Sequence, residues 1–303
     1  MITINSSCPS AIWETQSELG EGVMWNASEK AVYFVDIEGK KIHQYRLNDN
    51  QKKSWNTHKK PTFFFPTNRS VYLCGMEDGL YWFSLFNGSV TLFYPLEEKF
   101  PNNRINDGYI DAKGQLWFGS MDEKEKKLTG SLYLLKWDQA KPYVIRQDRE
   151  YAVLNGPVID EDKQILYCSH SNAHEIFSFD IEDGQKLANK RLFVKEMEGY
   201  PDGMALDCEN NLWVCLYQGH KINVYSSDGH KLKSIDFPCP NLTKIAFGGN
   251  DLKTAFVTSA RAKISKKDLE KYPKAGALFT FDNNITGKRQ NIFHIPDEVR
   301  LEE

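Results

Sequence analysis

Four short motifs along the sequence carry an acidic or amide side chain next to glycine. They are Leu19-Gly-Glu-Gly22, Arg104-Ile-Asn-Asp-Gly108, Leu154-Asn-Gly-Pro157 and Tyr200-Pro-Asp-Gly-Met204, and each precedes an aromatic, strand-like run by about ten residues. If those runs belong to equivalent repeats, Glu21, Asn155 and Asp202 would face one axis with two carboxylates and one amide oxygen. Such hard oxygen donors suit calcium, magnesium or manganese, with water filling the remaining positions.

The same residues also have a purely structural interpretation. Asn-Gly and Pro-Asp-Gly are common turn sequences, because Asn, Asp and Gly tolerate the backbone dihedrals of tight turns. Residue types alone therefore leave open whether these motifs bind anything. The choice depends on whether the chain is built from repeats that bring the motifs together.

An apolar, aromatic run followed by a turn and a second such run recurs six times. Counted from Val32, Val71, Leu116, Leu166, Leu212 and Ala255, the steps are 39, 45, 50, 46 and 43 residues. This spacing predicts one four-stranded blade per repeat. We therefore expect an all-β fold: a six-bladed β-propeller with a central metal site. The propeller should form a single domain over residues 1–303. A β-sandwich is the alternative, and it predicts less regular spacing.

Local signals add detail to this architecture. Asp78-Gly79, Asp183-Gly184 and Asp228-Gly229 predict tight hairpin connections. Ser265 followed by Asp268 predicts the start of a short helix inserted in the last blade. The six cysteines form no Cys-x-x-Cys pair, so we expect buried thiols in a reducing compartment, with a disulfide or zinc cluster as the alternative.

Composition and charge narrow the range of partners. Aromatic residues make up 13% of the chain, which favours many short strands, and the formal net charge is −3 without a basic cluster, which argues against nucleic acid. Residues 1–8 lack a basic segment followed by an apolar run, and no apolar stretch is long enough to span a membrane. We expect a cytoplasmic monomer or weak homo-oligomer that binds neither nucleic acid nor membrane.

The four motifs, in this order, resemble those of the senescence marker protein, gluconolactonase and luciferin-regenerating enzyme family, also called regucalcin-like. Gly114-Gln-Leu-Trp-Phe-Gly119, Asn211-Leu-Trp-Val214 and Val257-Thr-Ser-Ala-Arg261 extend the resemblance, which runs from about residue 12 to about 285. The resemblance implies a six-bladed propeller with one divalent ion on its axis. It also implies hydrolysis of a sugar lactone, with calcium or zinc among the metals.

The resemblance further implies roles for individual residues. The metal-binding Glu, Asn and Asp of the family fall on Glu21, Asn155 and Asp202, and its substrate-contacting Arg and Asn fall on Arg104 and Asn106. Some relatives bind the sugar through a glutamate of the charged loop, which here spans residues 122–127 and offers Glu123. His170 replaces an acid of the family pattern, and whether it or the loop contacts substrate stays open. Glu18 is a rival of Glu21, but only Glu21 matches the Glu-Gly-x-x-Trp pattern.

These residues could hydrolyse an ester. One divalent ion (Ca²⁺, Zn²⁺, Mn²⁺ or Mg²⁺) would polarise the lactone carbonyl and activate water. Asp202 is the candidate general base, and Arg104 and Asn106 would position the small-molecule lactone. The sequence has no Gly-x-Ser-x-Gly serine elbow and no nucleotide-binding glycine motif. Two alternatives stay open: a non-catalytic divalent-metal (calcium) binding propeller, and an esterase or phosphotriesterase on the same scaffold.

Overall fold

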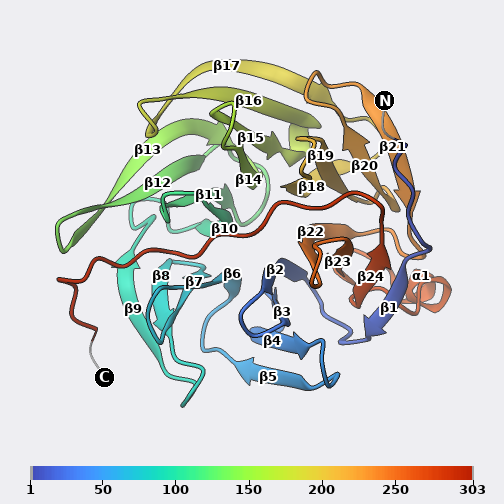
Figure 1. The fold of residues 1–303 in the computed structure, drawn as a ribbon, viewed down its shortest axis with the longest axis horizontal. Coiled ribbons are helices and arrows are strands. Elements are labelled where there is room, and N and C mark those ends of the chain that lie inside the picture. Colours follow the sequence, from blue (N-terminus) through green and yellow to red (C-terminus); the bar gives the residue numbers. More distant parts are fainter. Residues whose placement is uncertain (1–2, 302–303) are drawn as a thin grey trace.

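The protein is described by a computed structural model that covers residues 3–301 and consists almost entirely of short antiparallel strands. The strands form six four-stranded sheets arranged around a central axis (Figure 1). The predicted all-β, six-bladed propeller is therefore confirmed, and the β-sandwich alternative is wrong.

Each of the first five blades takes four consecutive strands, which run in order from the axis to the rim. Blade 1 contains β2 (Gly20–Asn26), β3 (Ala31–Asp36), β4 (Lys41–Arg46) and β5 (Lys52–Asn56), and blade 2 contains β6 (Pro61–Pro66), β7 (Tyr72–Met76), β8 (Gly79–Phe83) and β9 (Val90–Pro95). Blade 3 contains β10 (Asn103–Ile110), β11 (Leu116–Asp122), β12 (Gly130–Asp138) and β13 (Lys141–Tyr151). Blade 4 contains β14 (Leu154–Asp160), β15 (Ile165–His170), β16 (Glu175–Glu182) and β17 (Lys186–Lys195), and blade 5 contains β18 (Tyr200–Leu206), β19 (Leu212–Tyr217), β20 (Lys221–Tyr225) and β21 (Lys231–Asp236).

Blade 6 closes the ring with both ends of the chain. Its inner strands are β22 (Leu242–Gly248), β23 (Thr254–Ser259) and β24 (Leu278–Asp282), and its rim strand is β1 (Ser10–Trp13), which pairs antiparallel with β24. The helix α1 (Lys266–Lys271) is inserted between β23 and β24, as predicted. The Ser265 hydroxyl caps this helix by accepting a hydrogen bond from the Asp268 backbone N–H at 3.1 Å.

The apolar runs of the sequence are the two middle strands of each blade, and they fill the space between neighbouring blades. Trp117 and Trp213 are fully buried, and their indole N–H groups donate to Asp111 and Asp207 at 3.0 and 2.9 Å. Between blades 1 and 2, Phe64 and Tyr72 of blade 2 stack with ring centroids 4.6 Å apart, and both rings pack against Tyr33 of blade 1. This packing holds the innermost strands in fixed positions around the axis.

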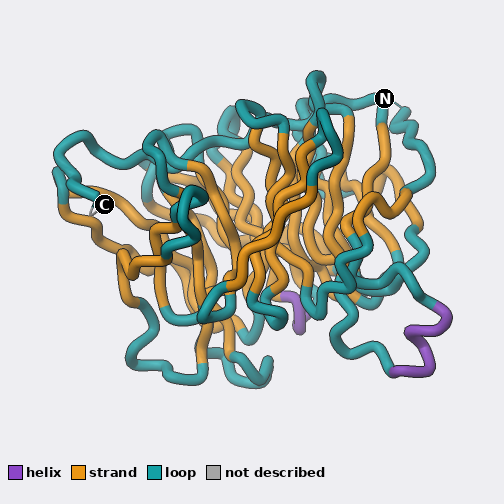
Figure 2. Tube along the Cα trace, turned by 90° about the horizontal axis from the view of Figure 1, so that it is seen from below, coloured by secondary structure: helices purple, strands orange, loops and turns teal. Residues whose placement is uncertain are grey.

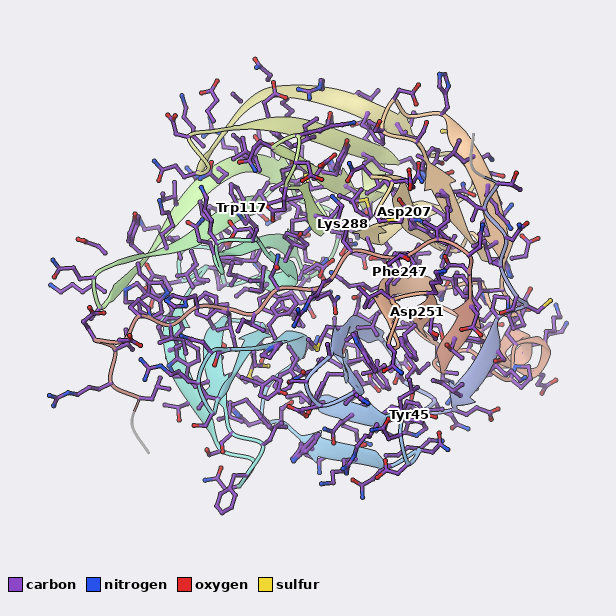
Figure 3. The ribbon with its side chains drawn as sticks, in the orientation of Figure 1. Tyr45, Trp117, Asp207, Phe247, Asp251 and Lys288 are labelled. Atoms are coloured by element: carbon purple, nitrogen blue, oxygen red, sulfur yellow. The ribbon has the colours of Figure 1, made fainter. Side chains whose placement is uncertain are left out.

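The segment after β24, residues 283–301, contains a strap that crosses the ends of the innermost strands. The Asn291 side chain donates to Ile110 O at 3.0 Å in blade 3, and the Lys288 backbone N–H donates to Leu206 O at 3.2 Å in blade 5. Figure 3 shows Lys288 near the centre of the propeller face, beside Asp207 and Phe247. This strap therefore covers the end of the channel where the innermost strands finish.

The cysteine expectation is only partly correct. Cys74, Cys168, Cys215 and Cys239 are buried, but Cys8 and Cys208 are exposed, and all six are free thiols. The two exceptions lie in a segment before β1 and in the turn after β18, where no blade covers them. No helix within residues 3–301 has the length and apolar character needed to cross a membrane.

Candidate metal centre and substrate pocket

The four polar motifs lie inside the innermost strands, and not in the separate turns that their Asn-Gly and Asp-Gly sequences also allowed. In β2, β10, β14 and β18 the pairing register shifts right at the motif, for example between Glu21 and Met24 and between Asn155 and Val158. A bulge of this kind interrupts the ladder and re-aims side chains. The polar residues therefore turn towards the axis while the rest of each strand stays paired.

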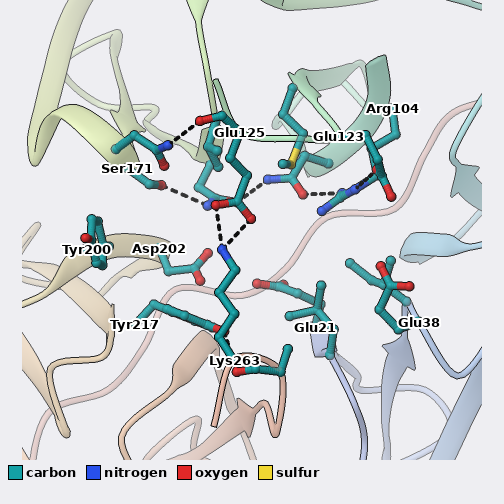
Figure 4. Close-up of a pocket in the computed structure, with 18 of the residues that line it drawn as sticks. Glu21, Glu38, Arg104, Glu123, Glu125, Ser171, Tyr200, Asp202, Tyr217 and Lys263 are labelled. Atoms are coloured by element: carbon teal, nitrogen blue, oxygen red, sulfur yellow. Dashed lines mark hydrogen bonds and ion pairs between the residues drawn. The ribbon is translucent and has the colours of Figure 1, made fainter. Parts of the chain in front are cut away.

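All six site residues named from the sequence line one cavity of about 560 Å³: Glu21, Arg104, Asn106, Glu123, Asn155 and Asp202. They come from four blades, and Figure 4 shows Glu21, Arg104, Glu123 and Asp202 pointing into a common space. The short helix η1 (Ser171–Ala173) also lines the cavity, and Figure 2 shows η1 and α1 at the same end of the stack of strands. The cavity therefore opens at the end opposite the strap.

A chain of hydrogen bonds joins the predicted substrate-binding and metal-binding residues. Arg104 Nη1 donates to Asn106 Oδ1, and Asn106 Nδ2 donates to Asn155 Oδ1, both at 2.5 Å. Asn155 Nδ2 then donates to Ser171 Oγ at 3.0 Å, and this hydroxyl donates to Pro201 O at 2.7 Å. These hydrogen bonds fix the orientation of the Asn155 amide. The Asn155 Oδ1 atom keeps one free lone pair for a further ligand.

Glu21 and Asp202 are buried together. Loss of solvation raises the pKa of both carboxyl groups, and the negative charges of Asp107 and of Glu21 raise the pKa of Glu21 and Asp202, respectively, further. The two groups lie within hydrogen-bonding reach, so without a cation they can share a proton. When both are ionised, Asp202 Oδ1 is buried and has no partner.

This orphaned oxygen tests whether the residues fit a metal ion. A buried carboxylate oxygen without a donor costs free energy unless a cation or proton satisfies it. Among residues 3–301 no cluster of three His, Cys, Asp or Glu side chains has metal-binding geometry. The donor set here contains only two carboxylates and one amide oxygen, a set that hard divalent cations accept together with water. Glu21, Asn155 and Asp202 therefore fit such an ion.

Sequence reasoning missed a buried ion pair beneath these residues. Lys244, from the bulge of β22, donates to Asp107 Oδ1 and to Gly108 O, the latter at 3.3 Å. The lysine side chain is 8% exposed and that of Asp107 is 1% exposed. Asp107 belongs to the motif Arg104-Ile-Asn-Asp-Gly108, whose sequence does not indicate a lysine partner. The signal for Lys244 is its place in blade 6, at the position equivalent to the other bulges.

Charged residues from the loops surround the mouth of the cavity. Glu123 forms ion pairs with Arg104 Nε at 2.9 Å and with Lys60, and it is more than one-third exposed. Glu125, from the same charged loop, binds Lys263, which comes from the loop before α1 (Figure 4). The loop 122–127 thus supplies two carboxylates to the pocket.

His170 and Glu18 lie outside the pocket. His170 Nε2 accepts a hydrogen bond from the Ala152 backbone N–H at 3.1 Å, and its ring packs edge-on against Tyr151. Glu18 is exposed, in contrast to the buried Glu21. The open question about His170 is therefore answered by a structural contact, and Glu21 is the carboxylate that reaches the axis.

Comparison with known proteins shows which family the chain belongs to. Residues 19–261 match the model of the SMP-30/Gluconolactonase/LRE-like region. The chain belongs to the SMP-30/gluconolactonase/LRE-like family. Within this family, regucalcin of Danio rerio is 30% identical over 286 residues, which are 92% of this chain and 94% of the relative. L-arabinolactonase of Azospirillum brasilense is 29% identical over 279 residues, 90% of this chain and 91% of the relative.

The fold agrees with solved structures of the family. A calcium-binding regucalcin of Agrobacterium tumefaciens superposes with a TM-score of 0.89 over 95% of this chain and 97% of its own, at 23% sequence identity. At that identity the likeness supports the fold alone. The family resemblance expected from the motifs is confirmed.

Proposed function

We propose that this protein is a metal-dependent hydrolase that opens the ring of a sugar lactone. Its family membership and its similarity to a protein named L-arabinolactonase support the reaction class. The observation that carries the metal dependence is the buried Asp202 Oδ1, which has no partner and lies beside Glu21 at the bottom of the pocket.

In this proposal Glu21, Asn155 and Asp202 hold one divalent ion. When bound, Ca²⁺, Zn²⁺, Mn²⁺ or Mg²⁺ would polarise the lactone carbonyl and lower the pKa of a water molecule. Asp202 would be one of the residues that hold this ion, and its carboxylate is also the candidate general base that would accept the proton of the attacking water. Burial of the site excludes bulk solvent around these groups, which strengthens each charge interaction.

Arg104, Asn106 and Glu123 orient the substrate. Glu123 holds Arg104 Nε and Asn106 holds Arg104 Nη1, so the plane of the guanidinium is set before substrate arrives. A guanidinium of fixed orientation suits the carbonyl and hydroxyl oxygens of a sugar lactone. Glu123 Oε1 pairs with Lys60, and Oε2 pairs with Arg104. A substrate hydroxyl would therefore donate to the remaining lone pairs on the exposed side of this carboxylate.

A non-catalytic calcium-binding propeller is the competing proposal, because a solved family structure is described as a calcium-binding protein. The observation that favours the enzyme is the pocket itself. A site that only stored calcium would not need a cavity of about 560 Å³ lined by Arg104 and Asn106. An esterase or phosphotriesterase on the same scaffold would share the metal residues and differ in its substrates.

A substrate panel separates these proposals. Aldonolactones, aryl esters and phosphotriesters are assayed with purified protein, with and without chelator. We expect hydrolysis of aldonolactones that disappears on chelation and returns with a divalent ion. Binding of calcium without turnover of any substrate would favour the storage protein, and full activity in the metal-free protein would contradict the metal-dependent mechanism.

A further inference from the structure

Lys244, its neighbour Thr243 and its partner Asp107 each contact the chain next to one of the three predicted metal ligands. The Lys244 side-chain stem packs on Gly203, beside Asp202, so closely that a Cβ at Gly203 would lie 2.7 Å from Lys244 Cγ. The neighbouring Thr243 hydroxyl donates to Gly20 O at 2.6 Å, beside Glu21. The third connection runs through Asp107.

Asp107 links Lys244 to Asn155. One carboxylate oxygen accepts from Lys244 and from the Gly108 backbone N–H at 2.7 Å. The other accepts from the Gly156 backbone N–H at 2.9 Å, directly after Asn155. The backbone beside each predicted ligand is thus held by Lys244, by its neighbour or by its partner.

The ion pair between Lys244 and Asp107 spans the channel. Asp107 belongs to blade 3 and Lys244 to blade 6, which stand opposite each other in the ring of six. The lysine also lines a small cavity on the side of the strap. The Lys244–Asp107 pair therefore forms the floor that separates the substrate pocket from the far end of the channel.

The charges around the floor match one divalent ion. Glu21, Asp107 and Asp202 supply three carboxylates, and Lys244 supplies one ammonium, which leaves two negative charges when all are ionised. The remaining charged side chains that line the pocket form pairs among the described residues: Arg104 with Glu123, Glu38 with Lys60, and Glu125 with Lys263. Without Lys244, three negative charges would face the cation.

We propose that Lys244 is a positioning residue that neutralises Asp107 and so sets the charge of the metal centre to suit a divalent ion. This inference rests on the proposed metal centre. The lysine keeps Asp107 bound to the floor, leaving the cation to Glu21, Asn155 and Asp202. Its effect on metal preference is electrostatic, because an extra buried negative charge attracts a trivalent ion more strongly than a divalent one.

The test compares the affinities of the protein for Tb³⁺ and Ca²⁺, measured by terbium luminescence and by calorimetry on metal-free protein. Lys244→Met should raise the ratio of Tb³⁺ to Ca²⁺ affinity by at least about tenfold. Asp107→Asn leaves one negative charge and should move the ratio in the opposite direction. The double variant restores two negative charges and should return the ratio to the parent value. Loosened packing alone would weaken both ions together and would not produce opposite shifts.

Lys288→Met is the matched control. Lys288 lies 3.7 Å from the fully buried Asp160, so this change also removes a lysine from a buried carboxylate, but it does so at the strap. The control should leave the affinity ratio unchanged. An unchanged ratio in both Lys244→Met and Asp107→Asn would overturn the inference, and if only one of them folds, an unchanged ratio in that one suffices. Absence of Ca²⁺ and Tb³⁺ binding in the parent protein would instead refute the metal centre itself.

Discussion

Two lysine–carboxylate bridges join the same two opposite blades, one below the pocket and one at its mouth. At the floor, Lys244 and Asp107 are 8% and 1% exposed, whereas at the mouth Lys263 and Glu125 are 52% and 34% exposed. Both connect blade 3 with blade 6. Two ion pairs of the same type therefore lie in two different dielectric environments within one channel.

The difference in solvent exposure determines what the loss of one partner costs in each bridge. A buried pair cannot lose one partner cheaply, because the remaining charge stays desolvated, whereas water and salt replace a lost partner at the surface. We therefore expect the floor to be a fixed part of the proposed metal centre. The mouth bridge can open and close at little cost, which suits a place where substrate must enter and leave.

The largest expected effect separates Asp202, the buried carboxylate above the floor, from the exposed charges at the mouth. Asp202→Asn keeps the shape of the side chain but removes the proton acceptor, and it should lower kcat for the lactone by about 10²–10⁴-fold. Glu125→Gln should change kcat by no more than a few fold, since this residue contacts only the mouth. Steady-state kinetics at saturating metal measure both. Equal losses in the two variants would mean that the mouth, and not Asp202, limits the reaction.

Stability should follow the same contrast. Lys244→Met leaves Asp107 buried without its cation and should reduce the free energy of unfolding by about 3–5 kcal/mol. Lys263→Met breaks an exposed pair and should cost no more than about 1 kcal/mol. Urea denaturation followed by tryptophan fluorescence gives both values. The contrast fails if the two lysines have the same effect.

The pH dependence of the metal-free protein should come from the two buried carboxyl groups above the floor. Burial raises the pKa of Glu21 and of Asp202, so between the ordinary carboxyl range near pH 4 and the raised values the folded state binds more protons than the unfolded chain. Stability from this source is complete below that range and is lost as pH rises through the raised pKa values.

Thermal melts from pH 4 to pH 8 test this sign. The metal-free parent should lose stability from the two carboxyl groups as pH rises, and the Glu21→Gln/Asp202→Asn variant should show a smaller loss. Added Ca²⁺ should stabilise the parent increasingly as pH rises, because the cation must displace the shared proton. A parent and double variant with identical profiles would show that these carboxyls are not linked to stability.

The sequence predicted the repeat but not every strand. The middle strands could be found because they are buried and aromatic, as at Trp117 and Trp213. The rim strands were missed because they face solvent: β5 (Lys52–Asn56) is mostly exposed and polar, so it carries no apolar pattern. The closure of blade 6 by β1 was also missed, because it joins residues about 270 positions apart, beyond any local signal.

The site was predicted where a residue type matched a family motif. Glu21, Asn155 and Asp202 were named in this way, and the structure brings them into one pocket. Because Asn-Gly and Asp-Gly also occur in turns, the bulges that carry these residues were interpreted as turns. Lys244 could not be found, because a lysine in a strand usually faces water and its partner Asp107 lies 137 positions away. Only the closed ring shows that the two meet.

The smallest expected effect concerns substrate charge at the mouth. Glu125 holds the Lys263 ammonium, whose Nζ also lies 5.8 Å from the centre of the Tyr217 ring, at the edge of the pocket. With the pair intact, Lys263 offers no unpaired positive charge, so the pocket should favour neutral lactones. Glu125→Gln removes the competing carboxylate but keeps a hydrogen-bond acceptor of the same size.

We expect Glu125→Gln to leave KM for a neutral aldonolactone within about threefold and to improve kcat/KM for a lactone that bears a carboxylate by about two- to fivefold, in line with one exposed charge pair worth at most about 1 kcal/mol. The gain should shrink as salt is raised, because exposed charges are screened. Lys263→Met is the counterpart and should bring no gain for the anionic lactone. If both variants improve it equally, removal of a physical barrier explains the effect and the mouth bridge has no role in selecting charge.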